Sequence, residues 1–193
     1  MFSLIAGFWN YFFSKTEVNI LILGLDYAGK TTILEQVKGM YGRKPGISPD
    51  KIPPTIGLNI GKFEISNCKV TIWDLGGQVR MRSIWDKYYK DTHGMIFVID
   101  SVDISRFEEA KLAFDSLLNH PNLSEVPMML VANKQDLPNA IHTEDVGVNF
   151  EVHVIKQRPI RVQSMSGLTK QGISEGMSWI VEESERNARK FGR

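Results

Sequence analysis

The segment from Gly24 to Thr32, GLDYAGKTT, contains the residues best suited to binding a phosphate group. Two glycines enclose four residues and are followed by Lys30 and Thr31. The glycines let the backbone curl so that its N–H groups point at phosphate oxygens, at the positive end of the helix that follows. In this pattern the lysine contacts the β- and γ-phosphates, and the threonine hydroxyl is a ligand of Mg²⁺. The residues expected to bind nucleotide here are Gly24, Leu25, Asp26, Tyr27, Ala28, Gly29, Lys30, Thr31 and Thr32.

A second group of polar residues, WDLGGQ, closes a strand-like segment at residues 73–78. An acid at the carboxyl end of a strand beside the phosphate loop suits the Mg²⁺ shell, so Asp74 is expected there. We expect the Gly77 N–H to reach the γ-phosphate and Gln78 to orient the attacking water. An Asp-x-x-Gly sequence alone is commonly a turn, but the glutamine and the preceding phosphate loop favour a functional site. The expected catalytic residues are Gln78 and Lys30.

The third motif, Asn133-Lys134-Gln135-Asp136, also follows a strand-like segment. Its carboxylate can accept hydrogen bonds from both the ring N–H and the exocyclic amine of guanine, whereas adenine offers no such pair of donors. A buried carboxylate left unpaired opposite the wrong base gives large discrimination. Such a turn also occurs without function, but the order of the three motifs favours guanine binding through Asn133, Lys134 and Asp136.

Composition restricts the class of protein. The 193 residues suit one domain with a full hydrophobic core. The formal charge of +1 gives no field that would favour a nucleic-acid partner. The single cysteine, Cys68, excludes an internal disulfide, favours a reducing compartment and is expected to pack in the core. Apolar stretches are too short to span a bilayer, which predicts a soluble or peripheral protein. We also expect a monomer.

The hydrophobic pattern predicts an α/β fold: a six-stranded, mainly parallel sheet with helices on both faces. Strands alternating with helices place ligands at the carboxyl ends of the strands. The Gly- and Pro-rich stretch 39–54 is expected to be a loop. The predicted strands are 18–25, 58–65, 68–74, 94–100, 127–133 and 159–164, and the predicted helices are 79–90, 104–119, 143–153 and 173–190.

The motifs resemble those of small GTPases, and within them the ADP-ribosylation factor and Arf-like family. GLDYAGKTT, PTIGLNI, WDLGGQ and NKQD carry the resemblance, which covers nearly the entire chain, and SIWDKYY at 83–89 is similar to the Arf-related subgroup. The resemblance implies a P-loop NTPase (small GTPase) fold and a slow GTPase that uses GTP, GDP and Mg²⁺. It makes Thr55 the switch I threonine of the GTP state, so that the expected metal ligands are Thr31, Thr55 and Asp74. It also makes Ser166, Gly167 and Leu168 the loop that contacts guanine.

Two positions in the phosphate loop depart from common patterns. Tyr27 replaces a commoner Asn or Ala of the family, and Asp26 stands where many other small GTPases carry glycine. A carboxylate beside the γ-phosphate repels charge that builds up in the transition state, which predicts very slow unaided hydrolysis that a partner's arginine relieves. Arg80 and Arg82 are expected to be exposed surface charges.

The amino-terminal segment MFSLIAGFWNYFF at 1–13 places aromatic and aliphatic residues on one face of a helix, through the spacing of Phe2, Ile5, Trp9 and Phe12. Such a face can lie in a membrane interface, or it can pack permanently on the domain. The resemblance implies a groove-bound helix in the GDP state that is expelled when the hairpin at 58–73 slides on GTP binding. The expected division is an amphipathic membrane and switch helix at 1–16 and a GTP-binding domain at 17–193.

The resemblance also predicts how the protein is anchored and with what it interacts. Phe2 in place of Gly excludes N-myristoylation. The resemblance to the Arf-related subgroup implies acetylation of Met1 and recognition by an integral Golgi membrane protein. The predicted function is a GTP/GDP switch that cycles from the cytoplasm onto Golgi or trans-Golgi membranes and recruits effectors. Its predicted partners are an exchange factor, an activating protein that supplies an arginine, effectors and a Golgi membrane receptor.

Two other functions compete with the switch. A metabolic P-loop enzyme, such as a nucleotide kinase, needs a lid and an acceptor pocket, and the long segments are already assigned to the core fold. A non-catalytic scaffold that binds nucleotide permanently or not at all would act through the amino-terminal segment. The presence of Lys30, Thr31, Thr55, Asp74 and Gln78 favours the switch over the scaffold.

Overall fold

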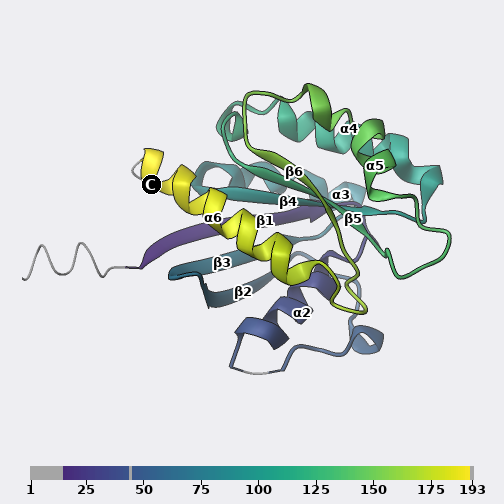
Figure 1. The fold of residues 1–193 in the computed structure, drawn as a ribbon, viewed down its shortest axis with the longest axis horizontal. Helices are drawn as coiled ribbons and strands as arrows, with labels where there is room; N and C mark the ends of the chain where they lie inside the picture. Colours follow the sequence, from purple (N-terminus) through teal and green to yellow (C-terminus); the bar gives the residue numbers. More distant parts are fainter. Residues whose placement is uncertain (1–14, 44, 192–193) are drawn as a thin grey trace, which may run out of the picture.

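The computed structural model of the protein describes residues 15–43 and 45–191 (Figure 1). One six-stranded sheet runs through the described residues in the order β2-β3-β1-β4-β5-β6. Its ladders are parallel except for the antiparallel β2–β3 hairpin. The strands are β1 (Thr16–Gly24), β2 (Leu58–Ile65), β3 (Cys68–Leu75), β4 (Gly94–Asp100), β5 (Met128–Asn133) and β6 (Ile160–Ser164). The predicted α/β fold and all six strands are confirmed, with ends that differ by a residue or two.

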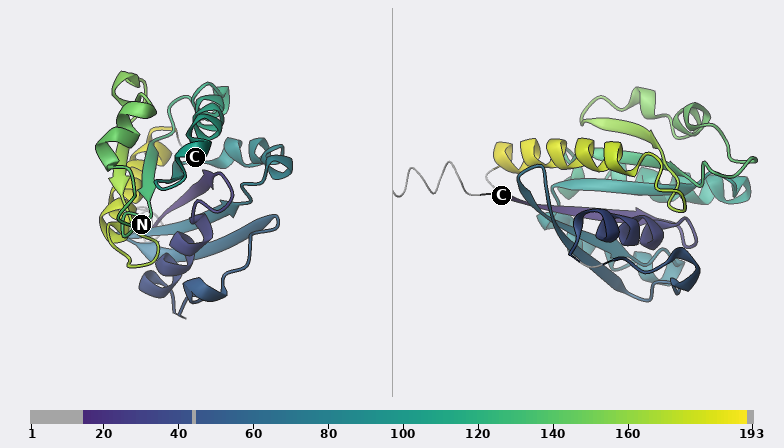
Figure 2. Two further views of the ribbon diagram at one scale, coloured as in Figure 1. Left: turned by 90° about the vertical axis from the view of Figure 1, so that its right-hand side faces the viewer. Right: turned by 60° about the horizontal axis from the view of Figure 1, so that its bottom comes forward.

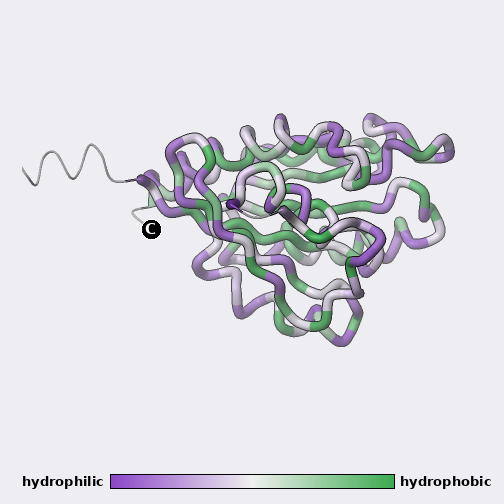
Figure 3. Tube along the Cα trace, turned by 90° about the horizontal axis from the view of Figure 1, so that it is seen from below, coloured by the Kyte–Doolittle hydropathy of each residue, from purple (hydrophilic) through white to green (hydrophobic). Residues whose placement is uncertain are grey.

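Helices cover both faces of the sheet, which makes the central strands apolar on both sides (Figures 1 and 2). Alternate residues of β1 enter different cores: Ile20 and Ile22 face α2 and α6, whereas Leu21 and Leu23 face α4. Colouring by hydropathy places the apolar residues along the sheet and the polar ones mainly in outer turns (Figure 3). The helices are α2 (Lys30–Tyr41), α3 (Val79–Arg82), α4 (Phe107–Leu118), α5 (Thr143–Asn149) and α6 (Ile173–Phe191).

The continuous helix predicted for 79–90 is wrong. Helix α3 ends at Arg82, and a 3-10 helix, η2, follows at Trp85–Asp91. The buried Trp85 indole donates a hydrogen bond from Nε1 to the Gly76 carbonyl oxygen at 3.1 Å. This long-range contact holds residue 85 against the end of β3, and the chain bends there instead of continuing as one α-helix.

Three further predicted boundaries differ from the structure. Helix α5 ends at Asn149 and not at 153, because Glu151 adopts a left-handed conformation with φ of 52°. The predicted helix at 104–119 begins as a 3-10 turn, η3 (Ile104–Arg106), before α4. The stretch 39–54 is not all loop, because α2 continues to Tyr41 and a 3-10 turn, η1, forms at Pro49–Lys51.

The turn between β2 and β3 forms as its residue types predict. Ser66 and Asn67 both have positive φ, at 49° and 64°, as a tight two-residue hairpin requires. No helix within the described ranges is long and apolar enough to cross a membrane. The predicted helix at residues 1–16 lies almost wholly outside the described residues, and its last position, Thr16, opens β1.

Candidate nucleotide-binding site

The phosphate loop joins the end of β1 at Gly24 to the start of α2 at Lys30. Glycine is required at both of its predicted glycine positions. A Cβ on Gly24 would lie 2.4 Å from the Val98 carbonyl oxygen, and one on Gly29 would lie 2.2 Å from Asn133 Nδ2. Both glycines also have positive φ, at 135° and 93°. The loop therefore has the close packing and backbone curl that turn N–H groups toward a phosphate.

Lys30 is buried at the first position of α2, where a phosphate would be held. Its Nζ donates a hydrogen bond to the Leu25 carbonyl oxygen at 2.7 Å. Burial lowers the pKa of Lys30 to about 8, and the nearby Asp74 and Asp26 carboxylates only partly oppose this. An anionic phosphate would favour the charged form of this lysine.

A cluster of oxygen atoms from three elements meets the requirements of a magnesium site. Thr31 Oγ1 lies 2.7 Å from Asp74 Oδ2 and 2.5 Å from Thr55 Oγ1. Asp74 is fully buried and its Oδ1 has no hydrogen-bond partner among the described residues. Burial raises the pKa of Asp74, and the Thr31 hydrogen bond opposes that shift. A bound cation would stabilise this carboxylate, so the residues fit Mg²⁺, which prefers oxygen ligands.

Within the described residues, no three His, Cys, Asp or Glu side chains are grouped so as to hold a metal ion by themselves. The candidate site instead combines one carboxylate with two hydroxyls. This composition suits a metal that shares its shell with substrate phosphates and water.

Gly77 and Gln78 lie at the end of β3, beside the phosphate loop. A Cβ on Gly77 would lie 2.4 Å from the Asp26 backbone nitrogen, so only glycine permits this close approach. Gln78 precedes α3, and its Oε1 accepts a hydrogen bond from Arg80 Nε at 3.0 Å. The two residues are therefore placed at the edge where the γ-phosphate is expected.

Asn133 connects three of the predicted nucleotide-binding segments. Its Nδ2 donates to the Ala28 carbonyl oxygen at 2.7 Å, and its Oδ1 accepts from the Gly167 N–H at 3.0 Å. Asp136 Oδ1 accepts from Ser166 Oγ at 2.5 Å. The structure therefore brings the phosphate loop, the Asn-Lys-x-Asp motif and the 166–168 loop together, although they are far apart in the sequence.

Lys134 and Leu168 complete the predicted base-binding residues. Lys134 has a φ of 64°, and its Nζ forms an ion pair with Asp100 Oδ2 at 2.6 Å. Leu168 is exposed. Asp100 was not predicted as part of this region, but it ends β4 and so lies at the same carboxyl edge of the sheet.

Two arginines that the sequence did not single out as site residues contact the phosphate side of the site. Arg106 donates from Nη1 to Asp26 Oδ1 at 2.9 Å and from Nη2 to the Asp26 carbonyl oxygen at 3.1 Å. The repulsive carboxylate predicted at Asp26 is therefore paired with a cation. The only available sequence signal was the position of Arg106 shortly after a strand end, which does not specify a partner.

Arg82 is not the exposed surface charge that was predicted. Its Nε donates to the Gly77 carbonyl oxygen at 3.0 Å, and its Nη2 pairs with Glu109 Oε1 of α4 at 2.6 Å. Arg80 is exposed, as predicted. Arg82 therefore joins the segment after β3 to α4.

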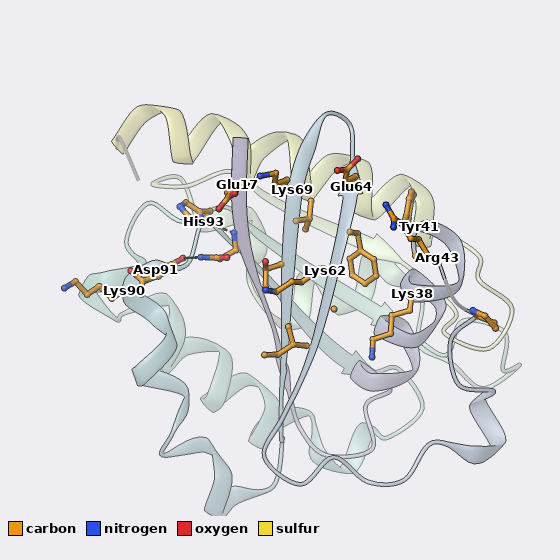
Figure 4. Close-up of a pocket in the computed structure, with 18 residues that line it drawn as sticks. Glu17, Lys38, Tyr41, Arg43, Lys62, Glu64, Lys69, Lys90, Asp91 and His93 are labelled. Carbon is orange, nitrogen blue, oxygen red and sulfur yellow. Dashed lines mark hydrogen bonds and ion pairs between the residues drawn. The ribbon is translucent and has the colours of Figure 1, made fainter. Parts of the chain in front are cut away.

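A separate groove of about 1260 Å³ lies beside the β2–β3 hairpin (Figure 4). None of its lining residues belongs to the phosphate, magnesium or base motifs. Its walls come from the hairpin, the end of α2, β1 and the segment before β4, and they carry mixed charges that include Lys62, Glu64, Lys69 and Asp91. Lys15, the first described residue, pairs with Glu64 Oε2 at 2.5 Å.

The fold and the grouped motifs define a guanine-nucleotide-binding protein of the small GTPase class. A family model of the ADP-ribosylation factor family matches residues 5–184. The chain is 43% identical to human ADP-ribosylation factor-related protein 1 over 97% of this chain and 94% of that protein. It is 36% identical to ADP-ribosylation factor-like protein 3 of Saccharomyces cerevisiae, over 97% of this chain and 96% of that protein. The chain belongs to the ADP-ribosylation factor family.

A solved structure agrees with this assignment. The Arl6 BBS3 small GTPase from Trypanosoma brucei, with bound nucleotide analogue GppNp, superposes with a TM-score of 0.78 at 30% identity. The match covers 89% of this chain and 99% of that one. As a member of the family, the protein binds GTP and GDP with Mg²⁺ and hydrolyses GTP. The metal neutralises phosphate charge in such sites.

Proposed function

We propose that the protein is a GTP-dependent switch of membrane trafficking at the Golgi or trans-Golgi, which reaches the membrane through its amino-terminal segment and recruits effectors there. The observation that carries the proposal is the 2.5 Å contact between the Thr31 and Thr55 hydroxyls. Thr55 lies just before β2, so its position is mechanically linked to the β2–β3 hairpin. Loss of the γ-phosphate would release Thr55 and allow the hairpin to move.

In this proposal the phosphate side of the site carries the hydrolytic chemistry. Lys30 offsets charge on the β- and γ-phosphates, and the Gly77 N–H binds the γ-phosphate. Gln78 orients the water for in-line attack. Thr31, Thr55 and Asp74 would hold Mg²⁺, which would offset phosphate charge there. The buried Asp74 Oδ1, which has no hydrogen-bond partner in the described part of the chain, supports this assignment.

The base side gives the specificity for guanine. Asp136 accepts hydrogen bonds from the ring N–H and exocyclic amine of the base, and Lys134 and the 166–168 loop border it. Asn133 holds this loop against the phosphate loop through its two hydrogen bonds. The remaining loop residues, Leu25, Tyr27, Ala28 and Thr32, complete the path of the phosphate loop around the nucleotide.

The groove beside the hairpin supports the proposed link to the membrane. The described chain starts at Lys15 in contact with Glu64, which lines that groove. The described chain therefore begins next to the hairpin that is proposed to slide. A ligand that favours one position of the hairpin would shift the equilibrium of the amino-terminal segment between binding to the domain and binding to the membrane.

The switch would work with four classes of partner. An exchange factor releases GDP, and an activating protein supplies an arginine to the transition state. Effectors bind the GTP state, and an integral Golgi membrane protein recognises the acetylated amino terminus. A second signal of this kind is needed because an apolar stripe alone binds membranes weakly and reversibly.

Sedimentation with Golgi membranes tests the proposal. Full-length protein loaded with a non-hydrolysable GTP analogue should pellet, and GDP-loaded protein should stay in the supernatant. A variant that lacks residues 1–13 should exchange nucleotide normally and fail to pellet, whereas Thr16→Ala should behave as wild type. Equal pelleting in both nucleotide states would contradict the switch and favour a permanent scaffold.

A further inference from the structure

Arg106 binds the phosphate loop with most of its guanidinium group. Two of its nitrogens donate to Asp26, at 2.9 Å to Oδ1 and at 3.1 Å to the backbone oxygen. Its third nitrogen, Nε, pairs with Asp103 Oδ2 at 2.6 Å. Asp103 therefore holds the planar guanidinium in a fixed orientation, so that its other edge meets Asp26 as a two-pronged donor.

Asp26 lies where a terminal phosphate would meet the loop. The Asp26 backbone nitrogen is the atom that a Cβ on Gly77 would approach to 2.4 Å, and Gly77 is the residue proposed to bind the γ-phosphate. Asp26 and Arg106 also both act on the charge of Lys30, with opposite signs. A free carboxylate at this position would repel a γ-phosphate more strongly than the α- and β-phosphates deeper in the loop.

We propose that Arg106 is a positioning residue that holds the Asp26 carboxylate in an ion pair away from the terminal phosphate, and thereby raises the affinity of the site for GTP relative to its affinity for GDP. The proposal rests on the nucleotide site described above and adds a residue to it. Arg106 does not touch the nucleotide in this account. It acts through the charge and orientation of Asp26.

The size of the expected effect follows from exposure. The side chains of Arg106 and Asp26 are 28% and 33% exposed, so the pair itself contributes little to the stability of the fold. The same carboxylate, once unpaired, would face a triphosphate that carries one more phosphate group than GDP. Removal of the arginine should therefore change the ratio of the two affinities more than the stability of the protein.

The experiment measures the dissociation constants of GDP and of a non-hydrolysable GTP analogue, with Mg²⁺, for the full chain. Arg106→Gln should weaken binding of the GTP analogue, relative to binding of GDP, by roughly threefold to tenfold, as expected for partly exposed charges. The double variant Arg106→Gln/Asp26→Asn should restore the wild-type ratio, because the repelling charge is gone. Arg186→Gln is the matched control, since Arg186 pairs with Glu182 and Glu183 on α6.

Other outcomes would overturn the proposal. If Arg106→Gln weakens binding of GDP and of the GTP analogue equally, Arg106 has a structural role only. The same holds if adding Asp26→Asn does not restore the wild-type ratio of the two dissociation constants. If Arg106→Gln does not fold, Arg106→Lys keeps the charge but loses the two-pronged contact, and it should give an intermediate ratio. An unchanged ratio in Arg106→Lys would then contradict the proposal. Failure of the wild-type chain to bind guanine nucleotide would instead contradict the nucleotide site itself.

Discussion

The hydroxyl oxygens of Thr31 and Thr55 lie 2.5 Å apart. This contact brings the segment that precedes the β2–β3 hairpin against the first turn of α2. Asp74 lies near the end of β3, and its Oδ2 accepts a hydrogen bond from the same Thr31 hydroxyl at 2.7 Å. Three segments that are separated in the sequence therefore converge on one small polar volume. The proposed role of Thr55 as the switch I threonine of the GTP state requires such a convergence.

Thr55→Ala should weaken binding of a non-hydrolysable GTP analogue, relative to binding of GDP, by about tenfold, since loss of one polar ligand costs on the order of 1–2 kcal/mol of binding free energy. Competition binding with a fluorescent guanine nucleotide measures both affinities. Thr55→Ser keeps the hydroxyl and should retain most of the preference. Thr16→Ala, at the opposite end of β1 from the phosphate loop, should leave it unchanged. Equal affinities in Thr55→Ala and wild type would argue against a role for Thr55.

Asp136→Asn should exchange the base preference of the site. The asparagine offers one acceptor and one donor, which suits the ring N–H and carbonyl oxygen of xanthine and leaves the exocyclic amine of guanine without an acceptor. We expect GDP affinity to fall by about a hundredfold or more and xanthosine diphosphate to gain affinity. Asp145→Asn, on the exposed side of α5, is the control. Unaltered GDP binding in Asp136→Asn would contradict the assigned base contact.

Nucleotide binding should be coupled to proton uptake at Lys30. Burial lowers the pKa of this lysine to about 8 without nucleotide, and bound phosphates would raise it. Above pH 8 the free amine is mostly neutral, so binding at pH 8.5 should take up a proton, whereas at pH 7 the amine is already largely charged. Calorimetry of GDP binding in buffers of different ionisation enthalpy measures this uptake.

The exposed lysine Lys62 provides the comparison for that measurement. Lys62→Gln should show the same proton uptake at pH 8.5 as wild type. Proton release at pH 8.5, or uptake that is equally large at pH 7, would contradict the assignment to Lys30.

Gly94→Ala should destabilise the domain by about 1–3 kcal/mol, because the added methyl overpacks a tight contact. A Cβ on Gly94 would lie 2.0 Å from Ser184 Oγ, which is buried on α6 and donates to the Ile180 carbonyl oxygen at 2.6 Å. Urea unfolding of the nucleotide-loaded protein measures the change. Ser184→Ala in the same chain should recover part of the loss.

Gly39→Ala is the control for the glycine prediction. A Cβ there would meet its nearest atom at 3.6 Å, and alanine is favoured over glycine within a helix; Gly39 lies in the last turn of α2. This variant should keep or raise the free energy of unfolding. Loss of stability in Gly39→Ala equal to that in Gly94→Ala would mean that the close approach of β4 to α6 is not the cause.

The contiguous motifs were predictable because their chemistry is local. Gly24 to Thr32 carry the turn geometry and the helix start within one segment, and Asn133 to Asp136 follow a strand whose apolar run is easily identified. The parallel α/β order then requires these strand ends to share one edge of the sheet. The sequence by itself therefore determined the fold class and the six strands, and the structure brings the predicted nucleotide-binding motifs together at one edge of the sheet.

Only the tertiary structure decided the contacts made by long, charged side chains and the path of the chain between elements. Arg106 and Arg82 reach Asp26 and Gly77 through their guanidinium groups, and no periodicity specifies such partners. The bend after Arg82 depends on the Trp85 indole meeting the Gly76 carbonyl oxygen. Local propensity and hydrophobic pattern reflect interactions between residues that are close in the sequence. The arginine and indole contacts instead join groups that meet only after the sheet and its helices have packed.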